Sequence, residues 1–214
     1  GLLERNKQSR VKQKEDLDQY TATPNTEARR ALLMNFFGDI KGKRILFLGV
    51  DFTSIAASYI GEASRIQVLD IDQDILNSLE KVADLEKIAV KTTSYDARTD
   101  LPQGFKGNFD VVFIDPPYTI SGAQLFVSRA LEALDRSNLS ARLYFSYGGS
   151  DRAKERFLPI YEVLVKSGLM IRWAFDKFNR YEAGAESIGS SSSLIVCDIN
   201  SKSVPLINGA FNSD

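Results

Sequence analysis

The sequence predicts an α/β protein whose sheet has seven mostly parallel strands, an antiparallel last strand, and helices on both faces. Short runs of β-branched and aromatic residues alternate with amphipathic segments along almost the whole chain. Residues 109–114 (FDVVFI) end in an unbroken apolar run, which is typical of a parallel strand buried on both faces. With 214 residues, 43% of them hydrophobic, the chain suits one domain with a full core.

The elements can be placed in chain order. The predicted strands are residues 44–52 with the following loop included, then 66–70, 89–93, 109–114, 141–147, 170–175 and 194–199. The predicted helices are residues 28–37, 55–60, 72–82, 123–134 and 153–166.

Local signals account for where the helices start. A turn and helix cap around Pro24 precede the first helix, and Thr53 or Ser54 is expected to cap the second. Asp72 and Asp74 begin the third helix, where negative charge opposes the helix dipole. Asp72 and Asp74 therefore have a structural explanation that needs no function.

A polar insertion is expected between the last two strands, at residues 176–193. It mixes aromatic with charged residues and then becomes a flexible run of Gly189 and four serines. A mobile lid that closes over a substrate would have this composition, and so would an ordinary loop between two antiparallel strands. Both interpretations are kept.

Composition limits the class of protein. Residues 1–17 are predicted to be a charged arm or linker, residues 18–200 the domain, and residues 201–214 a tail. A net charge of −1 provides no overall attraction to nucleic acid. The absence of histidine excludes Ser-His-Asp and Cys-His catalysis, and no metal site is expected.

Other features indicate a cytoplasmic protein. The single cysteine, Cys197, lies in an apolar run and is expected to be a buried core thiol. No signal peptide and no apolar run near 18 residues are found, so no membrane association is expected.

Four neighbouring strands are followed by an acid, and these acids are expected at one edge of the sheet. They are Asp51, Asp70, Asp96 and Asp115. Asp70 is placed to accept hydrogen bonds from a ribose diol, and Asp96 from an adenine amine. The first loop contains only Gly49 and lacks the Gly-x-Gly-x-x-Gly pattern of a pyrophosphate cradle, which argues against NAD or FAD. S-adenosylmethionine or its decarboxylated form is therefore the expected cofactor.

The segment Asp115-Pro116-Pro117-Tyr118 is the predicted catalytic loop. The prolines fix the backbone, so the Asp115 carboxylate and the Pro116 carbonyl can both accept hydrogen bonds while the Tyr118 ring forms a wall. Two acceptors and an aromatic face suit an amino nitrogen that attacks an electrophilic carbon. An acidic turn after a strand is the alternative without a function.

The strand acids and this loop resemble class I methyltransferases that methylate amino groups, such as adenine DNA methyltransferases. A closer resemblance is to the branched-chain polyamine synthases, the bis(aminopropyl)spermidine synthase family, over about residues 18–184. The matching segments are Asp18-Gln19, 23–26 (TPNT), Arg29-Arg30, 49–56, 68–72 (VLDID), 109–118, 125–130 (LFVSRA) and 178–181 (FNRY).

The resemblance implies transfer of an aminopropyl group from decarboxylated S-adenosylmethionine to a polyamine. It implies a catalytic site of Asp115, Pro116, Tyr118 and Asp51. It implies a cofactor site built from Gly49, Asp51, Asp70, Ile71, Asp96, Ala97 and Asp115. The family has a glycine and three aspartates where this chain has Gly49-Val50-Asp51-Phe52, so only Asp51 is carried over.

Two other functions are kept as alternatives. One is an S-adenosylmethionine-dependent methyltransferase acting on an amino group of nucleic acid or of a small molecule, with the basic N-terminal segment and Tyr118 serving a flipped base. The other is a non-catalytic relative that binds a ligand, because the first loop is altered. A small amine is the expected partner, with nucleic acid and a second copy of the chain, as a homodimer, as further candidates.

Overall fold

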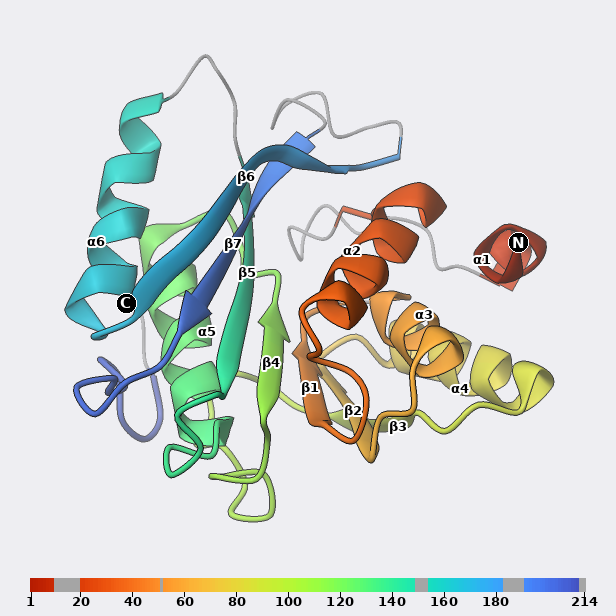
Figure 1. Ribbon diagram of the computed structural model, residues 1–214, viewed down its shortest axis with the longest axis horizontal. Helices are drawn as coiled ribbons and strands as arrows, with labels where there is room; N and C mark the ends of the chain where they lie inside the picture. The colour runs from red at the N-terminus through yellow and green to blue at the C-terminus, as the bar shows by residue number, and fades with distance from the viewer. Residues whose placement is uncertain (10–19, 51, 149–153, 183–190, 212–214) are drawn as a thin grey trace.

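The described part of the computed structural model contains one sheet of seven strands with helices on both faces (Figure 1). The structure describes residues 1–9, 20–50, 52–148, 154–182 and 191–211. The strand order is β3-β2-β1-β4-β5-β7-β6. Strand β7 is antiparallel to both of its neighbours, and all other pairs are parallel. The predicted fold class is confirmed.

The elements have the following bounds. The strands are β1 (Arg44–Leu48), β2 (Arg65–Asp70), β3 (Lys91–Ser94), β4 (Val111–Ile114), β5 (Arg142–Gly148), β6 (Met170–Arg180) and β7 (Ser191–Asp198). The helices are α1 (Leu2–Arg5), α2 (Pro24–Phe36), α3 (Thr53–Ile60), α4 (Gln73–Glu86), α5 (Ile120–Ala133) and α6 (Leu158–Lys166), with short 3₁₀ turns η1 (Lys7–Ser9) and η3 (Lys154–Phe157).

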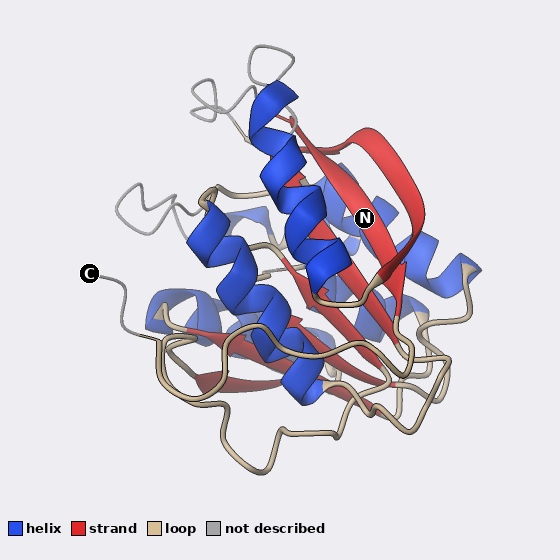
Figure 2. Ribbon diagram, turned by 90° about the vertical axis from the view of Figure 1, so that its left-hand side faces the viewer, coloured by secondary structure: helices blue, strands red, loops and turns tan. Residues whose placement is uncertain are grey.

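Strand β4 lies at the centre and contributes to the core on both faces of the sheet. Val112 and Ile114 belong to the cluster under α5 and α6, which is the face turned toward the viewer in Figure 2. Val111 and Phe113 belong to the cluster under α2, α3 and α4. This arrangement explains why the strand has no polar position, because each of its side chains enters one of two cores.

The last two strands are longer than the sequence predicts. In the register of β6 and β7, Asn179 is opposite Ser192 and Arg180 is opposite Ser191, after an irregularity between Phe175 and Asn179. Both ends of the expected insertion at residues 176–193 are therefore strand, and that prediction is wrong there. Several polar side chains at these strand ends bond to one another in a buried network. Hydrophobic periodicity does not detect such buried polar positions. Residues 183–190, where the lid or loop would be, lie outside the described part.

Helix starts show one confirmed and one wrong prediction. Thr23 caps α2, since its hydroxyl accepts a hydrogen bond from the Thr26 amide and Pro24 occupies the first turn. The helix thus begins four residues before the predicted position at Ala28. Thr53 and Ser54 do not cap α3, because both are buried inside its first turn and the N-cap is Phe52, which has no side-chain cap bond.

The described terminal segments pack against the domain. Leu2 and Leu3 are buried in the core cluster that includes α2 to α4, and the Arg5 guanidinium pairs with Glu86 at 2.5 Å. At the other end Ser203 is fully buried, and the Phe211 amide donates to the Arg98 carbonyl at 2.7 Å. Leu2 and Leu3 thus contact the domain, while residues 10–19 lie outside the described part, so the charged arm stays a prediction.

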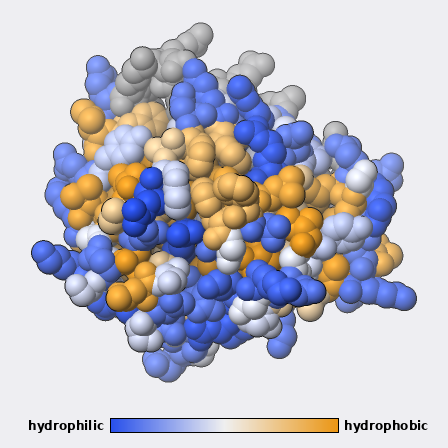
Figure 3. Space-filling view, viewed as in Figure 1, coloured by the Kyte–Doolittle hydropathy of each residue, from blue (hydrophilic) through white to orange (hydrophobic). Residues whose placement is uncertain are grey.

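Hydrophobic residues also reach the surface. On the face in Figure 3 they form a band across the middle of the molecule, with hydrophilic residues along the lower edge. Phe36 at the end of α2 is 81% exposed, which is unusual for so large an apolar side chain. The homodimer remains a prediction. Within the described residues, every helix is too short or too polar to cross a bilayer.

Candidate active site

The glycine after β1 allows the loops of two neighbouring strands to come together. Gly49 has a φ of +65°, and a Cβ at this position would lie 2.9 Å from Phe126 Cε1 and 3.3 Å from the Asp115 carbonyl oxygen. Strand β1 pairs directly with β4, so the turn at Gly49 lies against the start of the Asp115 loop. The structure thus brings Gly49 and Asp115 together, while their roles in binding a cofactor stay predictions.

The first loop carries hydrophobic residues on both sides of Asp51, where the family has further aspartates. Val50 and Phe52 are 2% and 3% exposed and belong to the core cluster with α3. Their side chains are therefore part of the hydrophobic core. Asp51 lies between them but outside the described residues, so its catalytic and cofactor-binding roles stay predictions.

The Asp115 carboxylate is bound by a buried arginine. Asp115 Oδ2 accepts a hydrogen bond from Arg30 Nη2 at 2.9 Å, and the side chains are 16% and 1% exposed. Arg30 lies on α2, on the same buried face as Ala31 and Met34. A guanidinium at this distance favours the ionised form of the carboxylate.

Arg30 also connects the site to the last strands. Its Nε donates to Asn179 Oδ1 at 2.8 Å, and its Nη2 donates to Ser146 Oγ at 3.2 Å. Asn179 Nδ2 in turn donates to Ser192 Oγ at 2.7 Å, and the Tyr181 hydroxyl lies 2.7 Å from the same Ser192 oxygen. The network joins α2, the loop after β4, and strands β5, β6 and β7.

Sequence reasoning missed most of this network. Arg30 and Asn179 occur in segments that support the family resemblance, but neither was given a role, and Ser146, Tyr181 and Ser192 were not predicted as site residues. One signal was available for Arg30, namely its position among the apolar residues of a helix face. An arginine is rarely buried there unless its charge is paired, so a carboxylate partner could have been expected. Its partner could not be deduced, since Asp115 lies 85 residues away in sequence.

Tyr118 forms part of an aromatic group beside Asp115. Its ring centroid lies 6.1 Å from that of Tyr20 and 5.4 Å from that of Tyr147. Burial raises the pKa of the Tyr118 hydroxyl well above its usual value, and Tyr181 and Asp115 add to the shift. Burial, with Asp115 second, raises the pKa of Tyr181 to about 12. Both hydroxyls are therefore neutral at physiological pH and can only serve as weak acids or hydrogen-bonding groups.

The two prolines shape the loop between Asp115 and Tyr118. Pro116 is buried, and the Pro117 carbonyl accepts a hydrogen bond from the Thr119 amide at 2.8 Å. The Thr119 hydroxyl then caps α5 by accepting from the Gly122 amide at 3.0 Å. The loop is thus held from both sides, while the predicted role of the Pro116 carbonyl stays a prediction.

The residues predicted to hold adenosine lie at the ends of β2 and β3. Asp70 is 5% exposed and its Oδ1 accepts from the Asp72 amide at 2.8 Å, whereas the neighbouring Ile71 is 46% exposed. Since Asp70 is opposite Ser94 in the pairing of β2 and β3, Asp96 follows at the same edge of the sheet. Hydrogen bonds from Arg98 lower the pKa of Asp96. Asp70, Ile71 and Asp96 therefore lie at one edge of the sheet, and their roles in binding adenosine stay predictions.

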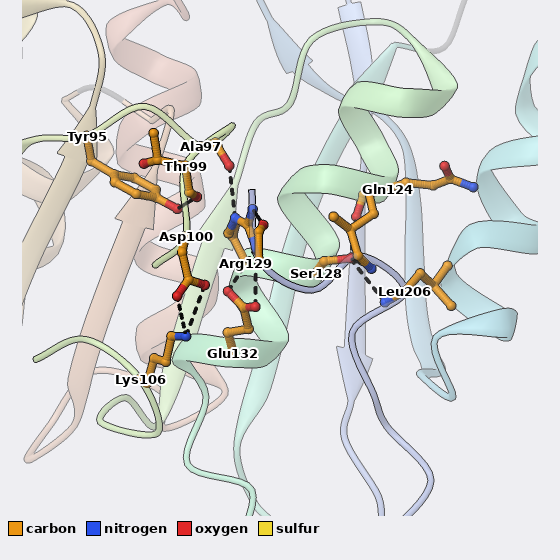
Figure 4. A network of polar contacts seen from close by, with 12 residues as sticks. Tyr95, Ala97, Thr99, Asp100, Lys106, Gln124, Ser128, Arg129, Glu132 and Leu206 are labelled. Carbon is orange, nitrogen blue, oxygen red and sulfur yellow. Dashed lines mark hydrogen bonds and ion pairs between the residues drawn. The ribbon is translucent and has the colours of Figure 1, made fainter. Parts of the chain in front are cut away.

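Arg129, a buried arginine, contacts the loop that follows β3 at this edge of the sheet (Figure 4). Arg129 is fully buried on α5 and its Nε donates to the Ala97 carbonyl at 2.9 Å. Its Nη2 donates to the Gly209 carbonyl at 2.5 Å, and its Nη1 pairs with Glu132 at 3.1 Å. The loop that carries Asp96 and Ala97 is therefore tied to α5 and to the C-terminal segment. Among the described residues, no group of three or more acidic or cysteine side chains converges on a metal-sized site.

Comparison with known proteins agrees with this geometry. The model of the branched-chain polyamine synthase A C-terminal domain matches residues 3–202. The chain belongs to this family. The resemblance seen in the sequence is thereby confirmed, and it extends beyond the segments that first indicated it.

Two curated relatives are longer than this chain, which matches a part of each. An uncharacterized protein of Methanocaldococcus jannaschii, MJ0675, is 41% identical over 177 residues, which are 82% of this chain and 44% of that protein. The N(4)-bis(aminopropyl)spermidine synthase of Thermus thermophilus is 32% identical over 169 residues, which are 78% of this chain and 49% of the relative. The chain thus spans about half the length of the curated relatives it matches.

Solved structures support the family and the fold. The Thermus thermophilus branched-chain polyamine synthase, in complex with N4-aminopropylspermidine and 5′-methylthioadenosine, has a TM-score of 0.87 at 27% identity, covering 100% of this chain and 67% of that one. A ribosomal protein L11 methylase from Lactobacillus delbrueckii has a TM-score of 0.58 at 16% identity, covering 81% of this chain and 79% of that one. The second likeness shows the fold alone, which is that of class I methyltransferases.

Proposed function

We propose that this chain transfers an aminopropyl group from decarboxylated S-adenosylmethionine to a polyamine nitrogen. The carrying observation is the Asp115 carboxylate, held by the buried Arg30 beside Tyr118 and against the turn at Gly49. Family membership supports it, as does the related structure that contains N4-aminopropylspermidine and 5′-methylthioadenosine. The first of these is an aminopropylated polyamine and the second is the thioether that aminopropyl transfer leaves behind.

The chain's residues would bind and align the two reactants. Asp70 would accept from the ribose hydroxyls, Ile71 would pack on the adenine ring, and Asp96 with the Ala97 loop would bind the adenine amine. The sulfonium cofactor supplies an electrophilic carbon and a neutral sulfur leaving group. Gly49, which packs closely against the Asp115 carbonyl, would let that end of the cofactor lie near Asp115.

Asp115 and the Pro116 carbonyl would accept hydrogen bonds from the attacking amine, and Tyr118 would pack on the carbon chain. Alignment is the main requirement, because a bond from nitrogen to carbon forms as the bond from carbon to sulfur breaks. The amine then loses its proton to Asp115 or to solvent. Neutral tyrosines beside the site would leave Asp115 as the base.

The test compares the two donors directly. The protein is incubated with spermidine and either decarboxylated or intact S-adenosylmethionine, and products are identified by mass spectrometry. We expect an aminopropylated spermidine and 5′-methylthioadenosine from the decarboxylated donor only. Methylated product from the intact donor would establish the methyltransferase alternative, and binding of both donors without turnover would establish the non-catalytic one.

Two variants separate catalysis from folding. Asp115→Asn should lower turnover at least about 10²-fold while the protein still binds 5′-methylthioadenosine. Asp110→Asn is the matched control, because Asp110 is also paired with an arginine, Arg44, but lies at the other end of β4. It should keep full turnover per folded molecule.

Salt-sensitive binding of RNA or DNA at low salt would favour nucleic acid as the acceptor.

A further inference from the structure

Burial of the Arg30 guanidinium costs free energy, and the fold alone does not explain it. Its guanidinium is 1% exposed, and its charge is balanced by a carboxylate that faces the predicted acceptor site. Burying an ion pair often stabilises a fold less than apolar residues of similar volume would. A cation placed here therefore points to a role in the chemistry of Asp115.

The protonation state of the acceptor makes such a role necessary. An amine attacks carbon only as the free base, whereas a lone carboxylate beside it stabilises the ammonium form, which has no lone pair. A guanidinium bonded to that carboxylate offsets its charge and keeps its hydrogen-bond acceptor in place.

We propose that Arg30 is a positioning residue that lowers the pKa of the bound acceptor amine, so that the amine binds as the neutral nucleophile. This proposal rests on the proposed function, since it requires an amine acceptor at Asp115. It would hold for an aminopropyl or a methyl donor alike, because both react with the free amine.

The surrounding charges favour this direction. Glu27 lies one turn before Arg30 on the same buried face of α2 and is 0% exposed. Tyr118 and Tyr181 face the ion pair as neutral hydroxyls, because the pKa of each is raised. The remaining described side chains of the network are uncharged, namely Ser146 on β5, Asn179 on β6 and Ser192 on β7. Without Arg30, the positive charge that is bonded to the Asp115 carboxylate at 2.9 Å would be lost.

The first test is the pH dependence of kcat in two variants. Arg30→Met removes the charge, and the pH of half-maximal kcat should rise by about one unit or more, as expected for loss of a unit charge several ångströms from the amine. Arg30→Lys keeps the charge, so its half-maximal pH should stay close to that of the unchanged protein even where kcat falls. A merely structural role for Arg30 would lower the rate without moving the profile.

Arg142→Met is the matched control for loss of a partly buried, paired arginine. Arg142 is 17% exposed and bonds Asp39 and Asp198 at the opposite end of β5 from Ser146. This variant should melt at a lower temperature but keep the original pH profile. A shift equal to that of Arg30→Met would overturn the proposal.

A second test needs no turnover. Spermidine is titrated calorimetrically into the protein saturated with 5′-methylthioadenosine, in buffers of different ionisation enthalpy, so that the number of protons released is measured. The unchanged protein and Arg30→Lys should release more protons on binding than Arg30→Met. If Arg30→Met does not fold, Asp115→Asn tests the same balance with opposite sign, because proton release should then begin at lower pH.

The outcomes distinguish the two proposals. Equal proton release and equal pH profiles with and without the Arg30 charge would overturn this inference and leave aminopropyl transfer intact. Failure of spermidine to bind the unchanged protein would overturn both.

Discussion

Tyr118 is positioned by a glycine as much as by its own loop. A Cβ at Gly148, the last residue of β5, would lie 2.6 Å from Tyr118 Cε1 and 2.9 Å from its Cδ1. Contacts this short force a neighbour to move, and the tyrosine ring is the group in the way. The absence of a side chain at residue 148 therefore determines where the aromatic wall of the site stands.

The substitution Gly148→Ala should displace the Tyr118 ring and weaken the alignment of acceptor and donor. We expect kcat/KM to fall about tenfold or more, because small misplacements in a reacting site are costly. Steady-state kinetics with spermidine would measure it. Gly104→Ala is the matched control, since a Cβ there meets no atom within 4 Å. Unchanged kinetics in Gly148→Ala would show that the position of Tyr118 does not matter for the reaction.

At the scale of elements, an ion pair joins the start of β1 to the start of β4 at the end of the sheet opposite the site. Arg44 Nη2 donates to Asp110 Oδ1 at 2.7 Å and Arg44 Nε donates to Oδ2 at 3.0 Å. The Arg44 backbone amide also donates to Oδ2 at 2.9 Å, and Asn138 adds a fourth donor, to Oδ1 at 3.0 Å. The hydrogen bond from Arg44 is the main cause that lowers the pKa of Asp110 from 3.8 to about 2.

This pair should make stability depend on pH. Because the pKa of Asp110 is lower in the folded than in the unfolded chain, its contribution is complete above about pH 4 and disappears as the pH falls toward 2. The size is about 2 kcal/mol. Asp110→Asn should lower the free energy of unfolding by about that amount at pH 7, and the difference from the unchanged protein should shrink between pH 4 and pH 2. Urea denaturation at several pH values measures it.

An exposed ion pair is the control for this experiment. Lys41 and Glu62 lie 2.9 Å apart, but their side chains are 78% and 79% exposed. Glu62→Gln should leave the unfolding curves nearly unchanged at every pH, because solvent screens such pairs. A constant difference between Asp110→Asn and the unchanged protein down to pH 2 would contradict the assigned titration.

At the scale of the whole molecule, the reactivity of one buried thiol measures how often the hydrophobic core opens. Cys197 is the chain's single cysteine, lies in β7, and is 0% exposed. The thiol lies in the core cluster between the sheet and helices α5 and α6, so it cannot reach solvent unless this core opens. Burial raises the pKa of Cys197 to about 12, so the reactive thiolate is also scarce in the folded state.

Native Cys197 should react with an aromatic disulfide reagent at least about 10³-fold more slowly than in the urea-unfolded chain, because reaction requires unfolding. Absorbance of the released thiolate measures the rate, and saturating 5′-methylthioadenosine should slow it further. The double variant Cys197→Ala/Ser201→Cys is the control, as Ser201 is exposed and should react at once. Fast reaction of native Cys197 would show that the core under α5 and α6 opens locally.

The sequence by itself determined the seven strands, the α/β class, the buried thiol, and the positions of Gly49, Asp70, Asp96 and Asp115 at strand ends. These features are local, because apolar runs and turn residues mark each element and parallel strands end at one edge of the sheet. The cap at Thr23 was local in the same sense.

Only the tertiary structure decided what surrounds Asp115. Arg30, Ser146, Asn179 and Ser192 are polar residues whose burial depends on partners far away in sequence, so in the sequence they look like surface positions. For the same reason the polar ends of β6 and β7 were predicted as an insertion. Hydrophobic periodicity detects a residue that avoids water, but a buried polar group is recognised only when its hydrogen-bond partner is known.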